Sequence, residues 1–223
     1  MMKAITIVGF GDSITEAAVN MPDTGLRWLN RLERKLNALA PENCRFQVFN
    51  AGVGGNSARE AMARMETDVL RHDPDWVLLE FGGNNNDPAH PERVVPPAEF
   101  KLHLAHFRAL LPAKTRVIVI TFPPIFPEQH IYWQNPAYRP YLEQTQATMG
   151  IDCYIEITRQ FAAENHYPLF DLNRVLVELG KSHGHDRYTL PDGVHLTAAG
   201  NAVLADGMLA LLRDQRNAAV EQR

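Results

Sequence analysis

The sequence predicts an α/β protein in which helices cover both faces of one parallel sheet. Short runs rich in β-branched residues alternate along the chain with segments that have helical periodicity. Strands that are separated by helices pair in parallel through right-handed crossover connections. The 223 residues contain no internal repeat, low-complexity tract or break in composition, so we expect a single domain.

The expected strands are short and apolar, and they are bounded by turn-forming residues. They span residues 4–10, 45–50, 75–81, 115–121 and 167–171. The expected helices span residues 24–39, 58–71, 97–111, 141–165 and 197–213. In the first helix, one face carries Leu26, Leu29, Leu32, Leu36 and Leu39. The domain is expected to end near residue 213, and the polar tail 214–223 is expected to fray.

The segment 122–140 does not fit either pattern, because it contains five prolines and five aromatic residues. It follows the carboxyl end of a predicted strand, where ligand sites form in open α/β sheets. Two interpretations stay open: a long surface crossover, or one wall of a substrate site formed by residues such as Phe126, Tyr132 and Trp133. These aromatic side chains suit a binding wall, and they also suit packing against the protein itself or against a second subunit.

The composition excludes several classes of protein. The net charge is −4, the pI is about 6.1 and no basic run is present, so nucleic acid is not expected as a partner. No apolar stretch is long enough to span a membrane. The two cysteines, Cys44 and Cys153, form no CxxC pattern and predict neither a disulfide nor a zinc site. Met1-Met2-Lys3 leads into the first strand without a signal-peptide pattern, so we expect a cytoplasmic protein.

A candidate nucleophile and a candidate base stand far apart in the sequence. Ser13 follows the first predicted strand in the turn Gly11-Asp12-Ser13, at the edge of the sheet where ligands bind. Asp192 precedes His195 by three residues, a spacing that lets the carboxylate orient the imidazole while its other nitrogen accepts a proton from a serine. Taken singly, Ser13 is also a typical helix cap, and Asp192 and His195 are also ordinary turn and surface residues.

Two further loops carry groups that can stabilise an oxyanion. The Gly54-Gly55 turn follows the second strand and presents backbone N–H groups without side chains to obstruct them. Asn84 follows the third strand and carries a neutral amide donor. With the Ser13 N–H, these groups can form an oxyanion hole.

Competing motifs are incomplete. The chain has no G-x-S-x-G serine elbow, and Gly9-x-Gly11 lacks the third glycine of a dinucleotide fingerprint. Gly52-x-Gly54 imitates that fingerprint more closely, but its ribose-binding acid is not clearly placed. His183-Gly184-His185-Asp186 can suggest a metal site, which Asp171 could join, although a solvated loop explains these residues better.

Taken together, these motifs resemble those of the SGNH hydrolases, the GDSL-like esterase, lipase and acylhydrolase superfamily. The four blocks of that family match at Gly11-Asp12-Ser13, Gly55-Asn56-Ser57, Gly82-Gly83-Asn84-Asn85 and Asp192 to His195, in the family's order. The resemblance implies a three-layer α/β/α sandwich, flavodoxin-like, with a five-stranded parallel sheet. It also implies ester hydrolysis by Ser13, His195 and Asp192 without metal or cofactor. The expected oxyanion donors are Ser13, Gly55 and Asn84, and Asp12 joins the aromatic residues above as a candidate for substrate binding.

The chain departs from the family pattern at two positions. Ala17 stands where many members have glycine, which can narrow the pocket beside Ser13. Asn85 replaces the commoner aspartate, and Asn86-Asp87 leaves open which amide faces the site. We expect a small-molecule ester as substrate, with a short or acetyl acyl group. A thioesterase or lysophospholipase with the same residues, and a non-catalytic carbohydrate-binding relative, are the alternatives.

Overall fold

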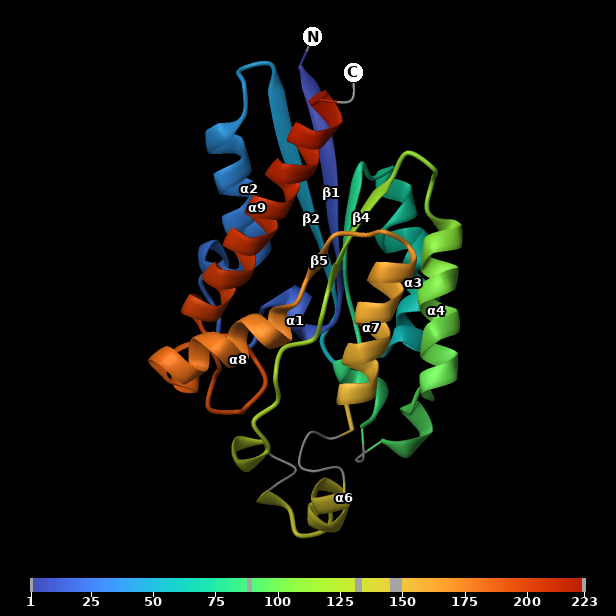
Figure 1. Ribbon diagram of the computed structural model, residues 1–223, viewed down its shortest axis with the longest axis vertical. Coiled ribbons are helices and arrows are strands. Elements are labelled where there is room, and N and C mark those ends of the chain that lie inside the picture. Colours follow the sequence, from blue (N-terminus) through green and yellow to red (C-terminus); the bar gives the residue numbers. More distant parts are fainter. Residues whose placement is uncertain (1, 88–89, 131–133, 145–149, 222–223) are drawn as a thin grey trace.

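The protein is a three-layer α/β/α sandwich around a five-stranded parallel sheet (Figure 1). The computed structural model describes residues 2–87, 90–130, 134–144 and 150–221. The strands are β1 Lys3–Gly11, β2 Cys44–Gly52, β3 Trp76–Glu80, β4 Arg116–Ile120 and β5 Leu169–Phe170. Their order in the sheet is β2-β1-β3-β4-β5, which is the flavodoxin-like order, so the predicted fold class is confirmed.

Helices lie on both faces of this sheet (Figure 1). The α-helices are α1 Ser13–Glu16, α2 Trp28–Leu39, α3 Ala58–Asp68, α4 Pro97–Leu110, α6 Arg139–Gln144, α7 Asp152–Glu164, α8 Leu172–His183 and α9 Ala198–Glu221. Short 3₁₀ turns are η1 Thr24–Leu26, η2 Leu70–His72, η3 Gly83–Asn85, η4 Pro91–Arg93, η5 Pro127–Gln129 and η6 His185–Arg187. Helices α2 and α9 pack on one face, and α3, α4 and α7 on the other.

The central strands are apolar on both faces because both faces are covered. Successive residues of β3 alternate between the two layers: Trp76 and Leu78 belong to one core, Val77 and Leu79 to the other. β4 alternates in the same way. Because both faces of the sheet are buried, polar groups are expected mainly at the ends of the strands.

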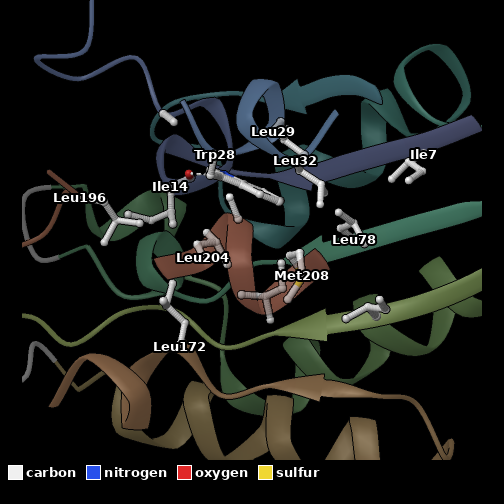
Figure 2. Packing of buried hydrophobic residues seen from close by; sticks show 14 of the residues in the cluster. Ile7, Ile14, Trp28, Leu29, Leu32, Leu78, Leu172, Leu196, Leu204 and Met208 are labelled. Carbon is white, nitrogen blue, oxygen red and sulfur yellow. Dashed lines mark hydrogen bonds between the residues drawn. The ribbon is translucent and has the colours of Figure 1, made fainter. Parts of the chain in front are cut away.

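Trp28 connects the first of these cores to the turn that carries Ser13 (Figure 2). Its ring is fully buried, and Nε1 donates a hydrogen bond to the carbonyl of Ile14 at 3.0 Å. Asn201 of α9 accepts the Trp28 backbone N–H at 3.0 Å, and its own amide donates to the carbonyls of Leu196 and Thr197. The segments that follow Ser13 and His195 are therefore tied to the same buried cluster.

Two helical predictions need correction. The predicted helix 141–165 is not continuous, because Gly150 has φ +67°, which no α-helix contains, and α7 begins only after it. The sequence analysis missed α8, which Asp171 caps by accepting the Arg174 N–H at 3.1 Å. His183 therefore ends a helix and His185 begins η6, where a single flexible loop was expected.

Smaller differences concern the ends of elements. The predicted helix 24–39 starts as η1, and the regular helix α2 begins at Trp28. α9 continues to Glu221, beyond the predicted end at residue 213. Leu39 was assigned to the buried face but is 60% exposed, since it stands at the last turn of α2, past the edge of the core.

The contrast between Leu32 and Leu39 gives a direct test of this packing. Leu32 is fully buried, so Leu32→Ala is expected to lower the free energy of unfolding by about 2–5 kcal/mol. Leu39→Ala is the matched control on the same helix and is expected to change it by less than about 0.5 kcal/mol. Urea denaturation of both variants measures the difference; equal losses would contradict the orientation of α2.

Candidate active site

The candidate residues meet at the carboxyl ends of β1, β2 and β3. The chain after β1 carries Ser13, the turn after β2 carries Gly55, and the turn after β3 carries Asn84. β1 lies between β2 and β3, so the strand order reverses there, and open α/β sheets form their ligand crevice at such a point. The fold therefore brings together groups that are distant in sequence.

Ser13, His195 and Asp192 form a continuous hydrogen-bonded row. His195 Nε2 lies 2.9 Å from Ser13 Oγ, and His195 Nδ1 lies 2.8 Å from Asp192 Oδ2. This connectivity allows the imidazole to take the serine proton while the carboxylate stabilises the resulting imidazolium. All three residues are half-buried, so the row is reachable from solvent.

The turn that carries Asp192 and His195 orients both side chains. Asp192 Oδ1 accepts the backbone N–H groups of Val194 at 3.0 Å and His195 at 2.9 Å, which leaves Oδ2 for the ring. Gly193 takes φ +74°, a conformation that glycine adopts without strain. Burial acts to raise the pKa of Asp192, but these hydrogen bonds outweigh it and the pKa is lowered, so the carboxylate stays ionised at neutral pH.

Two backbone N–H groups point to an oxyanion site. Ser13 is the first residue of α1, and within the described residues neither its N–H nor that of Gly55 has an acceptor. Gly55 has φ +76°, and Arg93 holds its carbonyl by a hydrogen bond. The neighbouring Gly54 N–H is not available, because it donates to Glu16 Oε2 at 2.9 Å.

Of the neighbouring amides, the Asn84 side chain is the one that lies beside the turns of Ser13 and Gly55. Its Nδ2 donates to Asp12 Oδ2 at 3.1 Å and to the Asn56 carbonyl at 3.3 Å, between the turns that carry Ser13 and Gly55. Asn85 is fully buried instead, and its Oδ1 accepts the Ala58 N–H at the start of α3.

The expectation that Asp12 binds substrate is not supported by its position. Asp12 is fully buried, and its Oδ1 accepts the Ile14 N–H at 2.9 Å as the cap of α1. Its other oxygen holds Asn84. Because no part of Asp12 is exposed, its carboxylate can orient other groups but cannot contact a substrate directly.

Within the described residues, the segment 122–140 contacts the turn that carries Asp192 and His195 through the backbone of Phe126. The Phe126 N–H donates to the Gly193 carbonyl at 2.7 Å, but the Phe126 ring packs on His185 at 4.3 Å between centroids. Tyr132 and Trp133 lie outside the described residues, so their predicted role stays a prediction. His130 was not singled out from the sequence; burial lowers its pKa, although the negative charge of Asp192 acts in the opposite direction.

A small cavity adjoins Ser13 and His195. Its volume is about 10 Å³, and its other lining residues are Ile14, Ala17, Val19, Leu196 and Asn201. Ala17 has φ +52°, so it occupies the left-handed region that favours glycine. Larger hollows of about 280 and 440 Å³ lie by α4, α7 and the amino end of β4, far from these reactive groups at the opposite strand ends.

In the part of the chain that the structure describes, no group of three or more His, Cys, Asp and Glu side chains is placed to hold a metal ion. Asp171, which could have joined His183 and His185, instead binds Arg159 at 2.9 Å and caps α8.

The chain is similar to known proteins in sequence and in fold. The model of the GDSL-like Lipase/Acylhydrolase family matches residues 10–203. An acetylxylan esterase of Geobacillus stearothermophilus is 28% identical over 206 residues, which cover 89% of this chain and 90% of the relative. An isoamyl acetate-hydrolyzing esterase 1 homolog of Rattus norvegicus is 25% identical, covering 87% of this chain and 76% of the relative. The crystal structure of a lipase/acylhydrolase from Enterococcus faecalis has a TM-score of 0.74 at 23% identity, covering 95% of this chain and 96% of that chain, and so shares the fold.

The hydrogen bond from Ser13 to His195 makes Ser13 the expected site of covalent labelling. A serine-directed phosphonate is expected to label the protein once, and Ser13→Ala is expected to abolish labelling while the protein stays folded, as judged by circular dichroism. Ser57→Ala is the control, since Ser57 is buried as the cap of α3 and should keep the wild-type labelling. Undiminished labelling of Ser13→Ala would show that another serine is the nucleophile.

Proposed function

Because this chain belongs to the GDSL-like lipase/acylhydrolase family and is a carboxylic ester hydrolase, we propose that Ser13, His195 and Asp192 are its catalytic triad. The observation that carries the proposal is the row of hydrogen bonds, 2.9 Å from Ser13 Oγ to His195 Nε2 and 2.8 Å from Nδ1 to Asp192. An imidazole placed in this way acts as general base toward the serine and then as general acid toward the leaving group.

The proposed reaction passes through an acyl-enzyme. Ser13 Oγ attacks the ester carbonyl as His195 Nε2 takes its proton, and the oxyanion is bound by the N–H groups of Ser13 and Gly55 and by the Asn84 amide. His195 then gives the proton to the alcohol oxygen as the ester bond breaks. In deacylation His195 takes a proton from water, the hydroxide attacks the acyl carbonyl, and the proton returns to Ser13 as the acid leaves. In comparable hydrolases, loss of one hydrogen-bond donor to the oxyanion costs about 3–4 kcal/mol of transition-state stabilisation.

The small cavity beside Ser13 supports a short acyl group, with acetyl as the best fit. Its volume of about 10 Å³ is close to the space that one water molecule needs, which favours a methyl group over a long chain. Two relatives, an acetylxylan esterase and an isoamyl acetate-hydrolyzing esterase 1 homolog, are named for acetyl esters and support the same assignment. We therefore propose a small acetylated alcohol as the substrate class.

The alternative activities make distinct demands on the site. A thioesterase or lysophospholipase acting on long chains needs an extended apolar channel next to Ser13, which the small cavity does not favour. A non-catalytic carbohydrate-binding role is disfavoured by the intact row of Ser13, His195 and Asp192.

We keep the cytoplasm as the expected location. Cys44 and Cys153 are both free thiols, which fits a reducing compartment. None of the helices in the described ranges is long and apolar enough to cross a membrane.

A series of p-nitrophenyl esters tests the proposed substrate class. Turnover, measured as kcat/KM, is expected to be highest for the acetate and to fall as the acyl chain lengthens, because the cavity has no room for further methylene groups. An optimum at eight or more carbons would favour the lysophospholipase or thioesterase activity, and no turnover of any ester would favour the binding role.

Ala17→Gly is expected to shift this optimum from acetate toward propionate and butyrate. Removal of the Ala17 methyl group enlarges the cavity beside Ser13, and glycine adopts the φ of +52° without strain. The free energy of unfolding is therefore expected to change by less than about 1 kcal/mol. Ala18→Gly is the matched control, because Ala18 does not line the cavity. An unchanged optimum in Ala17→Gly would show that another surface receives the acyl group.

The proposed mechanism uses no metal ion, so activity is expected to survive exhaustive chelation. The measurement is the rate of p-nitrophenyl acetate hydrolysis before and after dialysis against a chelator. A loss that one divalent ion restores would require a different mechanism.

A further inference from the structure

Two buried carboxyl groups lie directly behind the candidate active site and have no part in the proposed reaction. Glu80 is the last residue of β3, and Asp12 follows the last residue of β1, the neighbouring strand. Both side chains are fully buried. Acidic residues are rarely buried in this way unless specific partners hold them, so their role needs a physical explanation.

The contacts of these two residues lead from the interior to the oxyanion site. Glu80 Oε2 accepts the Thr15 hydroxyl at 3.0 Å and the Asp12 backbone N–H at 3.4 Å. Asp12 Oδ2 accepts the Asn84 Nδ2 group at 3.1 Å. Glu80 is thus linked to Asn84 through Asp12.

Burial raises the pKa of both carboxyl groups of this pair. Burial raises the pKa of Glu80 well above its ordinary value, and the charge of Asp12 raises it further. Burial also raises the pKa of Asp12, to about 6, although the hydrogen bond from the Ile14 N–H acts in the opposite direction. Glu80 Oε1 is buried without a hydrogen-bond partner among the described residues, a position that penalises a carboxylate more than a neutral acid. The unpartnered Glu80 Oε1 favours the proton on Glu80, and the two donors to the Asp12 carboxylate favour the negative charge there.

We propose that Glu80 is a positioning residue: its Oε2 holds the Thr15 hydroxyl and the Asp12 backbone N–H, which fixes the turn after β1, and Asp12 Oδ2 in turn fixes the Asn84 amide as an oxyanion donor. This inference rests on the proposed function and assigns a task to residues that the catalytic reaction does not use.

The hydrogen bonds of Asn84 explain why its side-chain amide has to be held in place. Its two N–H bonds are directed at Asp12 and at the Asn56 carbonyl, so one of them has to be exchanged for the oxyanion. The bond to Asp12 is shorter, at 3.1 Å, and is charge-assisted by a fully buried carboxylate, whereas the bond to Asn56 is longer, at 3.3 Å, and has a neutral carbonyl as acceptor. The Asn56 bond is the one that is given up, and the Asp12 bond keeps the amide plane from rotating.

Variants of Glu80 test this role through kcat and KM for p-nitrophenyl acetate. Glu80→Gln resembles the neutral acid in shape and polarity, and it is expected to keep kcat within about threefold of wild type. Glu80→Ala is expected to lower kcat by about 10²–10³-fold with little change in KM, as expected for loss of an oxyanion donor. Asn84→Ala is expected to show the same loss. The double variant is expected to be no worse than either single one, because both changes remove the same interaction.

A control separates positioning from general stability. Leu104→Ala creates a cavity in the core between the sheet and the helices α3, α4 and α7, away from Asn84. This variant is expected to lower the free energy of unfolding while leaving kcat unchanged. The proposal is overturned if Glu80→Ala behaves like Leu104→Ala, if its loss adds to that of Asn84→Ala, or if folded Glu80→Gln is as slow as Glu80→Ala.

A second measurement does not depend on ester turnover. The side-chain carboxyl ¹³C resonance of Glu80, assigned by its absence in Glu80→Gln, is expected to report a neutral acid at pH 7 in the wild-type protein. The Asn84 side-chain amide resonances are expected to be unchanged in Glu80→Gln and shifted in Glu80→Met, which keeps the side-chain volume. An ionised Glu80, or Asn84 resonances that do not respond to Glu80→Met, would contradict the proposal. Absence of ester hydrolysis by the wild type would contradict the proposed function alone.

Discussion

The burial of both sheet faces is the constraint on which this structure depends. Residues of β1, β3 and β4 supply apolar side chains alternately to two cores, so the middle of the sheet is apolar. Polar groups gather at the strand ends, and open α/β sheets bind ligands where the strand order reverses, here between β2, β1 and β3. Ser13, Gly55 and Asn84 stand at that end because each follows a strand of this central group.

The sequence predicted the fold class and pointed to candidate site residues because both depend on local patterns. Apolar runs and short motifs located the strands and the groups at their ends, including Ser13, Asp192 and His195. Asp12 was assigned wrongly because sequence spacing carries no information about burial. The helix α8 had a recognisable signal in the capping Asp171 and the spacing of Leu172 and Leu176, whereas Glu80, Asn201 and His130 derive their positions from contacts between distant segments. Such contacts exist only after the chain has folded.

Several features that lower the stability of the fold lie around the candidate site. Ala17 has a left-handed backbone, and Asp12 and Glu80 place two acids in the interior. Each of these lowers stability relative to an ordinary residue, and such strain persists only where the surrounding structure overdetermines it. The hydrogen bond from Trp28 to the Ile14 carbonyl and the capping of α1 by Asp12 provide that support. The rigidity of the turn after β1 thus originates in the core beneath it.

The turn from Asp192 to His195 reduces the number of parts that have to be aligned. Acid and base share one turn, in which Asp192 binds both the ring and the backbone of His195, so they move as a single body. If the three residues came from three separate segments, two contacts between segments would have to be aligned. Here only one contact joins separate segments, the 2.9 Å contact between His195 and Ser13. A displacement of the chain near α9 therefore changes the distance to the serine without changing the tautomer of the imidazole. The alignment of the three side chains therefore depends on the distance between His195 and Ser13.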